Sequence, residues 1–261
     1  MEVAGKVAIV TGAGGGGQGR ALALRLAREG ASVVVSDIDE AGGQETVRAI
    51  EAAGGHAAFL RADAGRESDA TALIAFAEKR FGGLDILVNN AGPYFHLHRL
   101  NHWDETMRAN LMGPIYTTLR AIKPMERRGG GAIIYYGSSS ALGHGLKHSP
   151  SPAYDVAKAG VARLTTTMEW LKETYGIRVN CIVPSWVASQ EVQSYVDSLT
   201  PEERRAGDVP ETLISLDEIS AVVLRLITDE TLNGRVLLWL NGSPPMLIPR
   251  GDPGYANLEP F

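Results

Sequence analysis

Short apolar runs recur along the chain, and longer stretches with helical periodicity separate them. Seven such runs occupy residues 7–10, 32–37, 57–63, 85–92, 132–139, 177–184 and 235–242. Each is mostly continuous rather than alternating, which is typical of strands covered on both faces. The helical patterns occupy residues 20–30, 40–53, 67–80, 101–127, 153–174 and 217–229. Because strands and helices alternate, the sequence predicts a single doubly wound α/β domain with a seven-stranded, mostly parallel sheet and helices on both faces.

A glycine-rich stretch, TGAGGGGQGR at residues 11–20, follows the first apolar run and precedes the first helical pattern. Glycine-rich segments are often flexible linkers, but a linker would not stand between a buried strand and the start of a helix. A strand, a glycine turn and a helix together make an anion site, because the helix N-terminus offers unpaired N–H groups and a partial positive charge. We therefore predict an anion-binding loop here. No G-x-x-x-x-G-K-[ST] motif occurs, which excludes a nucleoside-triphosphatase loop.

Asp37 ends the second apolar run, 18 positions after Gly19. In a dinucleotide-binding fold, an acidic residue at this place accepts hydrogen bonds from the adenosine ribose and repels a 2′-phosphate. The alternative is that Asp37 merely starts a turn. Residues 13–18 contain no Lys or Arg that could neutralise a 2′-phosphate. Both observations favour NAD over NADP as the cofactor.

The glycine loop, NNAG at residues 89–92 and YDVAK at residues 154–158 resemble the short-chain dehydrogenase/reductase family, whose members have a Rossmann fold. The resemblance extends from about residue 5 to about residue 243. The loop is one residue longer than the family's usual T-G-x-x-x-G-x-G, so Gly16 and Gly17 are alternatives for the pyrophosphate turn. The extra glycine is expected to bulge outward where a β-carbon would clash.

The resemblance implies a cofactor site along the carboxyl edge of the sheet. Asp63 is expected to bond the adenine edge, and the segment PSWVAS at residues 184–189 to bind the nicotinamide carboxamide, with Ser185 and Ser189 in place of the usual Gly and Thr. The segment NGS at residues 241–243 stands where the family commonly has D-G-G. The full set of expected cofactor-binding residues is Gly12, Gly17, Gln18, Gly19, Asp37, Asp63, Ala64, Asn89, Ala91, Gly92, Tyr154, Lys158, Pro184, Val187 and Ser189.

Tyr154 and Lys158 are four residues apart, so a helix would place them on one face. An ammonium beside a phenol favours the phenolate and lowers the tyrosine pKa from about 10 toward neutral pH. Such a phenol can exchange a proton with an alcohol or carbonyl oxygen as hydride moves to or from a nicotinamide. The alternative is an ordinary surface pair. The position of Tyr154 and Lys158, downstream of the glycine loop and of a serine-bearing strand end, favours the catalytic interpretation.

Two further residues complete the expected catalytic set. Counting from Gly131 along the family's G-x-I-V-x-x-S-S pattern selects Ser138, with Ser139 and Ser140 as alternatives. The selected hydroxyl would hold the reacting oxygen opposite the tyrosine. Asn110 matches the family asparagine that completes a water-linked proton path to the lysine. A mid-helix Asn is otherwise mildly unfavourable, which supports a functional role.

Composition narrows the class of protein and its surroundings. The chain has 261 residues, a formal net charge of −5 and a pI near 5.7, which argue against a nucleic-acid partner or a basic membrane surface. A single cysteine, Cys181, fits a reducing compartment, and no signal peptide or apolar run of membrane-spanning length occurs, so we expect a cytoplasmic protein. Residues from 242 onward are expected to be irregular. We place the domain at residues 1–249 and a tail at residues 250–261.

These patterns predict an NAD-dependent oxidoreductase that interconverts a secondary alcohol and its carbonyl compound. The alternatives are a catalytically silent NAD-sensing or scaffold protein on the same fold, and a methyltransferase, which would have no use for the Tyr–Lys pair. His98 and His102 have the spacing of metal ligands on a helix, but no acidic or Cys cluster completes the set, so no metal is expected. The resemblance implies a homotetramer, with a dimer as the alternative. An apolar substrate pocket is expected from Pro93, Tyr94, Phe95, His144, Leu146, Trp186 and Val187.

Overall fold

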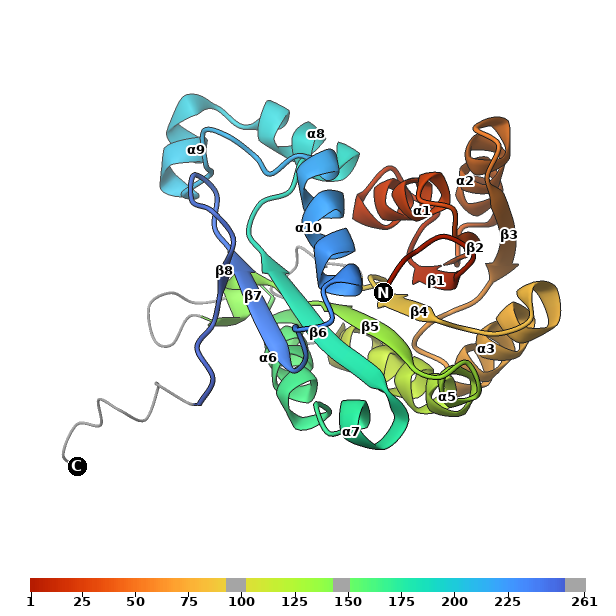
Figure 1. Cartoon of the computed structure of the whole chain (residues 1–261). Helices are drawn as coiled ribbons and strands as arrows, with labels where there is room; N and C mark the ends of the chain where they lie inside the picture. The colour runs from red at the N-terminus through yellow and green to blue at the C-terminus, as the bar shows by residue number, and fades with distance from the viewer. Residues whose placement is uncertain (93–101, 143–150, 252–261) are drawn as a thin grey trace.

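One mostly parallel sheet forms the centre of the computed structural model, which describes residues 1–92, 102–142 and 151–251 (Figure 1). Within these residues eight strands lie in the order β3-β2-β1-β4-β5-β6-β7-β8. The strands are β1 (Val7–Thr11), β2 (Ser32–Asp37), β3 (His56–Arg61), β4 (Ile86–Asn89), β5 (Gly131–Tyr136), β6 (Ile177–Pro184), β7 (Arg235–Trp239) and β8 (Met246–Leu247). The order reverses between β1 and β4, and ligands bind at such a switch point in doubly wound sheets.

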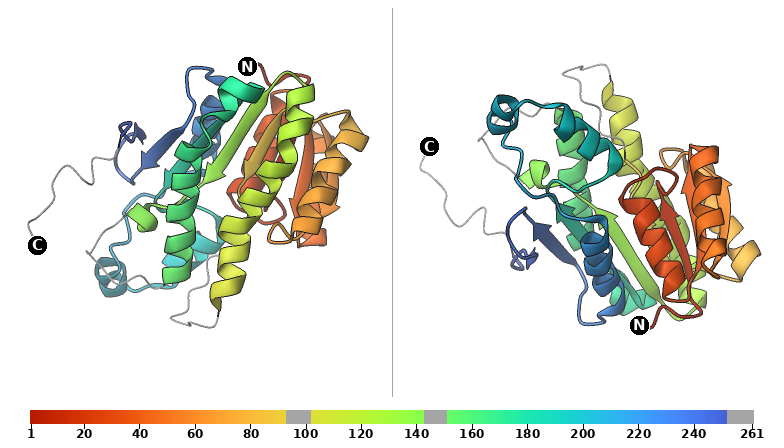
Figure 2. Two further views of the ribbon diagram at one scale, coloured as in Figure 1. Left: turned by 90° about the horizontal axis from the view of Figure 1, so that it is seen from below. Right: turned by 90° about the horizontal axis from the view of Figure 1, so that it is seen from above.

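Helices cover both faces of the sheet (Figure 2). They are α1 (Gln18–Arg28), α2 (Glu40–Ala52), α3 (Glu67–Phe81), α4 (Trp103–Met107), α5 (Gly113–Arg127), α6 (Pro152–Thr167), α7 (Leu171–Tyr175), α8 (Gln190–Ser198), α9 (Pro201–Ala206) and α10 (Leu216–Thr228). Buried residues of α1, α2 and α10 form the apolar core on one face, and those of α3, α5 and α6 form the core on the other. None of the helices in the described ranges has the length and apolarity that a membrane crossing requires.

The two cores explain why the strand sequences are continuously apolar. Successive side chains of a strand point to opposite faces, so Ile9 enters one core while Ala8 and Val10 enter the other. Val33 and Val34 divide in the same way in the neighbouring strand. Both faces of the sheet are therefore covered by apolar cores, which confirms the predicted α/β fold.

The structure differs from the prediction in four places, one of which is α8, a helix with no counterpart among the predicted helical patterns. An eighth strand, β8, pairs antiparallel with β7 in the stretch expected to be irregular, with Leu247 opposite Leu237. The predicted helix at 153–174 divides into α6 and α7. The helix predicted at 101–127 also divides, because a π-helical turn, Arg108–Met112, separates α4 from α5. Pro114 has no N–H to donate to the carbonyl of Asn110, four residues earlier, so one α-helical hydrogen bond is missing at this point.

Candidate active site

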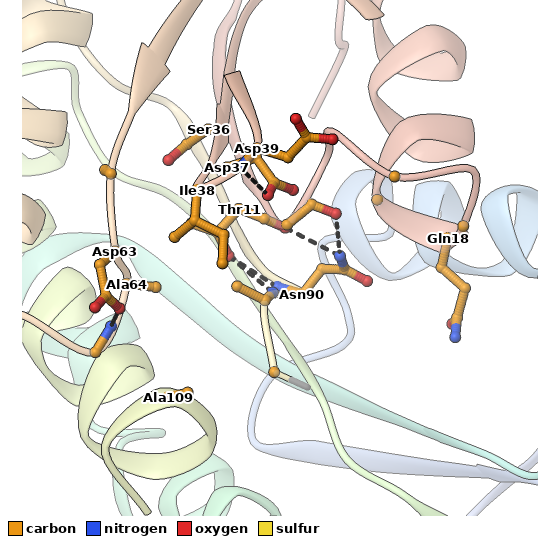
Figure 3. A pocket seen from close by; sticks show the side chains of 18 of the residues that line it. Thr11, Gln18, Ser36, Asp37, Ile38, Asp39, Asp63, Ala64, Asn90 and Ala109 are labelled. Carbon is orange, nitrogen blue, oxygen red and sulfur yellow. Dashed lines mark hydrogen bonds between the residues drawn. The ribbon is translucent and has the colours of Figure 1, made fainter. Parts of the chain in front are cut away.

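A cavity of about 1100 Å³ lies at the carboxyl ends of β1, β2 and β4 (Figure 3). The glycine loop and the start of α1 form one wall, and the start of α8 lies against this loop, where a β-carbon at Gly16 would lie 2.8 Å from the Oε1 of Gln190. Ten of the predicted cofactor residues line it, namely Gly12, Gly17, Gln18, Gly19, Asp37, Asp63, Ala64, Ala91, Gly92 and Ser189. The cavity therefore brings together segments that are far apart in the sequence, at the edge where ligands were expected.

Two glycines of the loop are required by close backbone approach. Gly12 has φ +66°, and a β-carbon there would lie 2.8 Å from the Cα of Ala91. A β-carbon at Gly19 would lie 2.2 Å from the carbonyl oxygen of Gly12. By contrast, a β-carbon at Gly15 would meet nothing within 4 Å. The strand, the loop and α1 are thus packed as closely as backbones allow, and Gly15 is the loop position that faces open space.

Side chains from β1 and the segment after β4 hold this loop in place. Asn90 donates from its Nδ2 to the carbonyl oxygens of Thr11 and Gly12, at 3.0 and 2.9 Å. The Oγ1 of Thr11 accepts from the backbone N–H groups of Asn90 and Ala91, both at 3.1 Å. Asn90 was not among the predicted site residues, although it is the second Asn of the NNAG motif. The sequence signal that could have found it is therefore that motif itself.

The Asp37 carboxylate is half-buried at the end of β2 and bonds the loop. Its Oδ2 accepts from the backbone N–H of Gly14 at 2.8 Å, and its Oδ1 accepts from the N–H of Asp39 at 3.0 Å. The second bond is the turn that the alternative interpretation expected. The carboxylate also lines the cavity, which is the position that ribose recognition would need. The two interpretations of Asp37 are therefore compatible.

Most of the charged residues that line the cavity are acidic. Besides Asp37, the described lining contains the carboxylates Asp39, Asp63, Glu105 and Glu191. It contains two arginines, Arg66 and Arg108, and Arg66 is paired with Asp63 at 3.3 Å. A second phosphate group near β2 would therefore meet more negative than positive charge.

The cavity fits a nicotinamide dinucleotide. Among the described residues no side chain caps the N-terminus of α1, so its first N–H groups are free to bind an anion. The Oε1 of Gln18 and the Nδ2 of Asn89 are buried without a hydrogen-bond partner in the described part of the chain. Buried polar atoms are normally bonded, so the unpartnered Oε1 of Gln18, a residue that lines the cavity, supports a ligand at this place. Asn89 itself lies behind the lining, where its Oδ1 accepts from Thr117 at 2.6 Å.

The Lys158 ammonium lies in the interior beside Tyr154. The lysine is only 4% exposed, its Nζ donates to the carbonyl oxygen of Tyr136 at 2.8 Å, and it lies 5.4 Å from the centroid of the Tyr154 ring. Burial disfavours the charged form and lowers the pKa of Lys158 to about 8. Helix α6 thus places the predicted pair on one face, as the spacing requires.

Gly92 connects this pair to the cavity. A β-carbon there would lie 2.3 Å from the Oδ1 of Asn110 and 3.1 Å from the Nζ of Lys158. Because Gly92 also lines the cavity, the amide and the ammonium lie directly behind the cavity wall. Asn110 is fully buried in the π-helical turn, and its Nδ2 donates to the carbonyl of Thr106 at 3.2 Å. Turns of this kind occur frequently at functional sites.

Three serines follow β5, and two of them are joined in a hydrogen-bonded chain. The Oγ atoms of Ser138 and Ser140 are 2.9 Å apart. Ser140 in turn donates to the Oδ1 of Asp155 at 2.6 Å. Asp155 follows Tyr154 in the first turn of α6, so the chain links the end of β5 to the start of the helix that carries the tyrosine.

Residues after β6 are held by Asn241, which sequence reasoning did not select. Its Oδ1 accepts from the backbone N–H of Trp186 at 3.0 Å, and its Nδ2 donates to the carbonyl of Trp186 at 2.9 Å. Ser189 caps α8 by accepting from the N–H of Val192 at 3.2 Å. Pro184 and Val187 are buried behind the lining rather than on it, and Val187 bridges to Ile214.

Several predicted residues lie outside the described ranges. These are Pro93, Tyr94, Phe95, His144 and Leu146 of the expected substrate pocket, and His98. Within the described ranges no group of three or more metal-ligating side chains occurs. His102 lies 3.4 Å from Glu105.

Comparisons with known proteins agree with this architecture. Residues 6–199 match the short chain dehydrogenase family, so the chain belongs to the short-chain dehydrogenase/reductase family of oxidoreductases. An uncharacterized oxidoreductase of Thermotoga maritima is 36% identical over 88% of this chain and 93% of its own. The cis-4-hydroxycyclohexanecarboxylate dehydrogenase of Sinomonas cyclohexanicum is 39% identical over 69% of this chain and 73% of its own. The crystal structure of levodione reductase superimposes with a TM-score of 0.80 at 27% identity, covering 91% of this chain and 96% of that one.

Proposed function

We propose that this protein is an NAD-dependent oxidoreductase that interconverts a secondary alcohol and its carbonyl compound. The observation that carries the proposal is the buried Lys158 ammonium, 5.4 Å from the Tyr154 ring and directly behind the wall of the cofactor cavity. Burying a charge is costly, and a fold rarely retains one without a use for it. A cation beside a phenol at the cofactor site is suited to acid–base chemistry.

In the proposed reaction each residue has one role. Tyr154 takes the hydroxyl proton in the oxidation direction and returns it to the carbonyl oxygen in the reduction direction. Lys158 favours the phenolate by its charge and holds the cofactor ribose, as the family resemblance implies. Ser138 orients the reacting oxygen, and Asn110 connects the lysine to the proton path. The bound nicotinamide supplies the hydride acceptor or donor.

The acidic lining supports NAD rather than NADP. The Asp37 carboxylate is fixed by two backbone N–H groups, so it cannot easily turn away from an added phosphate. The two lining arginines do not balance the five lining carboxylates, and one of them is already paired with Asp63. A 2′-phosphate would therefore bind with an electrostatic penalty.

We further propose a ring-borne secondary alcohol as the substrate class. The name of the Sinomonas relative specifies a hydroxylated cyclohexane ring. In this chain the ring of Trp186 stacks on that of Tyr195 at 6.2 Å, with an interplanar angle of 16°. Trp186 stands in the segment after β6 that the family uses for the nicotinamide. Flat aromatic surface at this place is suited to an apolar ring.

The test is a screen of purified protein with NAD against a panel of secondary alcohols, following the absorbance of the reduced cofactor. The panel should contain cis-4-hydroxycyclohexanecarboxylate, cyclohexanol and matched open-chain alcohols. We expect turnover with ring alcohols that exceeds turnover with open-chain ones. Tight NAD binding without turnover on any member would favour the silent NAD-sensing alternative.

We also propose that the protein is a homotetramer, with a dimer as the alternative. Leu119 and Val156 are about half exposed on α5 and α6, the two helices that the family resemblance assigns to subunit pairing. On and beside the same two helices, the apolar residues Leu111, Ile115, Leu164 and Met168 are only partly buried and are available for such a contact. Light scattering at micromolar concentration should give four times the chain mass of 27.9 kDa, or twice that mass for the dimer. The monomer mass would contradict the proposal.

A further inference from the structure

A chain of three side chains leads from the proposed substrate-orienting serine to a carboxylate. Ser138, Ser140 and Asp155 are joined at 2.9 and 2.6 Å. Ser140 is exposed, whereas Ser138 and Asp155 are half-buried. The family pattern selects Ser138 as the substrate-orienting serine and offers Ser140 only as an alternative to it, and it gives Asp155 no role. The chain therefore raises the question of what the two outer residues do.

The proton positions in this chain follow from the number of donors. A carboxylate only accepts, so the proton of Ser140 is directed to Asp155. A serine hydroxyl has one proton, so Ser140 has none left for Ser138. The 2.9 Å contact is therefore a hydrogen bond from Ser138 to Ser140. The Ser138 hydroxyl is thus fixed, with its proton toward Ser140.

This arrangement matters for the proposed reaction. To orient a reacting oxygen, Ser138 must donate its proton to that oxygen. If Ser138 turns its proton to the substrate, Ser140 can turn its own proton to Ser138, and Asp155 then loses a hydrogen bond. The chain accordingly has two directions, and Asp155 determines how they are weighted. A residue that acts in this way affects the reaction only through Ser138.

We propose that Ser140 and Asp155 are positioning residues that hold and direct the Ser138 hydroxyl. The inference rests on the proposed oxidoreductase function. An exposed serine and a half-buried carboxylate contribute little to the core, so substituting them should leave folding intact. Their effect should appear in kcat rather than KM, because the bond from Ser138 to the reacting oxygen matters most in the transition state.

The test is a double-mutant cycle with cis-4-hydroxycyclohexanecarboxylate and NAD. Ser138→Ala should lower kcat by roughly 10²-fold, the loss of one oriented donor. Ser140→Ala should lower kcat by roughly three- to tenfold, the contribution of one neutral hydrogen bond. In the Ser138→Ala background, Ser140→Ala should have no further effect, because its target is gone. Ser140→Thr keeps the hydroxyl and should restore most of kcat.

Two substitutions of Asp155 distinguish an effect of hydrogen-bond direction from an effect of holding Ser140 in place. Asp155→Ala removes the acceptor that holds the Ser140 hydroxyl in place, and this loss of anchoring should lower kcat as Ser140→Ala does. In Asp155→Asn the amide can donate to Ser140, which supports the direction in which Ser138 donates to the substrate. We therefore expect kcat of Asp155→Asn to equal or exceed that of the wild type. Equal losses in Asp155→Asn and Asp155→Ala would overturn the directional part of the inference.

A control and a reference variant keep this inference separate from the proposed function. Thr231→Ala removes another exposed hydroxyl that donates to a carboxylate at 2.6 Å, from Thr231 to Asp229, and it should leave kcat unchanged. Wild-type kcat in Ser140→Ala, or an equal loss in the Ser138→Ala background, would overturn the inference even while Tyr154→Phe abolishes turnover. Retained turnover in Tyr154→Phe would instead refute the proposed function.

Discussion

The half of the site around the glycine loop and the half around Lys158 differ in the groups that they bury. Near the loop, the side chains of Thr11, Asn90 and Asp37 bond neighbouring backbone groups. Near the lysine, an ammonium is buried with a lowered pKa and donates to the backbone carbonyl of Tyr136. The first half is therefore shaped by its own hydrogen bonds, and the second holds groups whose burial carries an energetic cost.

The two halves of the site are suited to different tasks, the loop half to cofactor binding and the lysine half to proton transfer. A loop that must fit a dinucleotide needs a fixed backbone, which local hydrogen bonds and glycines supply. A proton-transfer site needs groups whose charge changes at working pH, which burial supplies. Substitutions near Lys158 should therefore change rates and pH dependence, whereas substitutions near the loop should change cofactor binding.

The largest expected effect is that of Tyr154→Phe. Removing the hydroxyl deletes the proposed acid–base group, and such groups contribute on the order of 10² to 10⁴ in rate. The loss should appear in kcat and kcat/KM alike, while NAD affinity stays near the wild-type value. Steady-state kinetics and calorimetric titration with NAD would measure the two quantities. Most of the activity surviving in a folded variant would contradict the assignment.

The next effect concerns stability and pH at Lys158. In the unfolded chain a lysine has a pKa near 10.5, and in the folded protein burial lowers it to about 8. Between these values the unfolded state holds a proton that the folded state has released, so the contribution of Lys158 to the free energy of unfolding rises with pH from about 8 to about 10.5. Burial raises the pKa of Cys181 from 9.0 to about 12, so Cys181 contributes a fall above pH 9 in the wild type and in the variant alike. The destabilising effect of Lys158 is complete below its folded pKa. From the shift, it is at most about 3 kcal/mol.

Lys158→Met should remove this dependence. The variant loses a hydrogen bond to Tyr136, which shifts its stability equally at all pH values, so the slope is the quantity to compare. Denaturant unfolding at several pH values would give the slope for each protein. Lys172→Met is the matched control, since Lys172 also donates to a backbone carbonyl, at 3.1 Å, but is exposed. Parallel curves for the wild type and Lys158→Met would refute the lowered pKa.

Local patterns made the fold and the loop half predictable, and long-range contacts account for most of what was missed. Continuous apolar runs such as 32–37 require two buried faces, and the motifs at 11–19 and 89–92 are contiguous. Strand β8 has two residues, too few for a periodic pattern, and it depends on pairing with β7. The π-helical turn could not be predicted from Pro114 alone, because Pro124 also lacks an N–H and lies within α5 without such a turn.

The missed part of the site depends on contacts between distant segments. Asn241 bonds Trp186 across 55 positions, and Gly92 packs on Asn110 and Lys158. Neither spacing nor hydrophobic pattern predicts such contacts, because only the fold brings those residues together. The family resemblance predicted Asn110 and Lys158 as site residues, but it did not predict that a glycine would be required between them and the cavity.

The smallest expected effect concerns cofactor choice at Asp37 and is a direct test of the loop half. We expect the wild type to bind NAD at least tenfold more tightly than NADP, about 1.4 kcal/mol. Asp37→Asn removes the charge but keeps an oxygen that can accept from Gly14, so the loop should stay in place while the preference narrows several-fold. Asp37→Ala loses both the negative charge and the acceptor for the Gly14 N–H, so it should weaken NAD binding as well. Glu51→Gln makes the same change of net charge on the exposed end of α2 and should leave the preference unchanged. Fluorescence titrations with both reduced cofactors would measure all four proteins, and equal wild-type affinities would refute the role given to the Asp37 carboxylate.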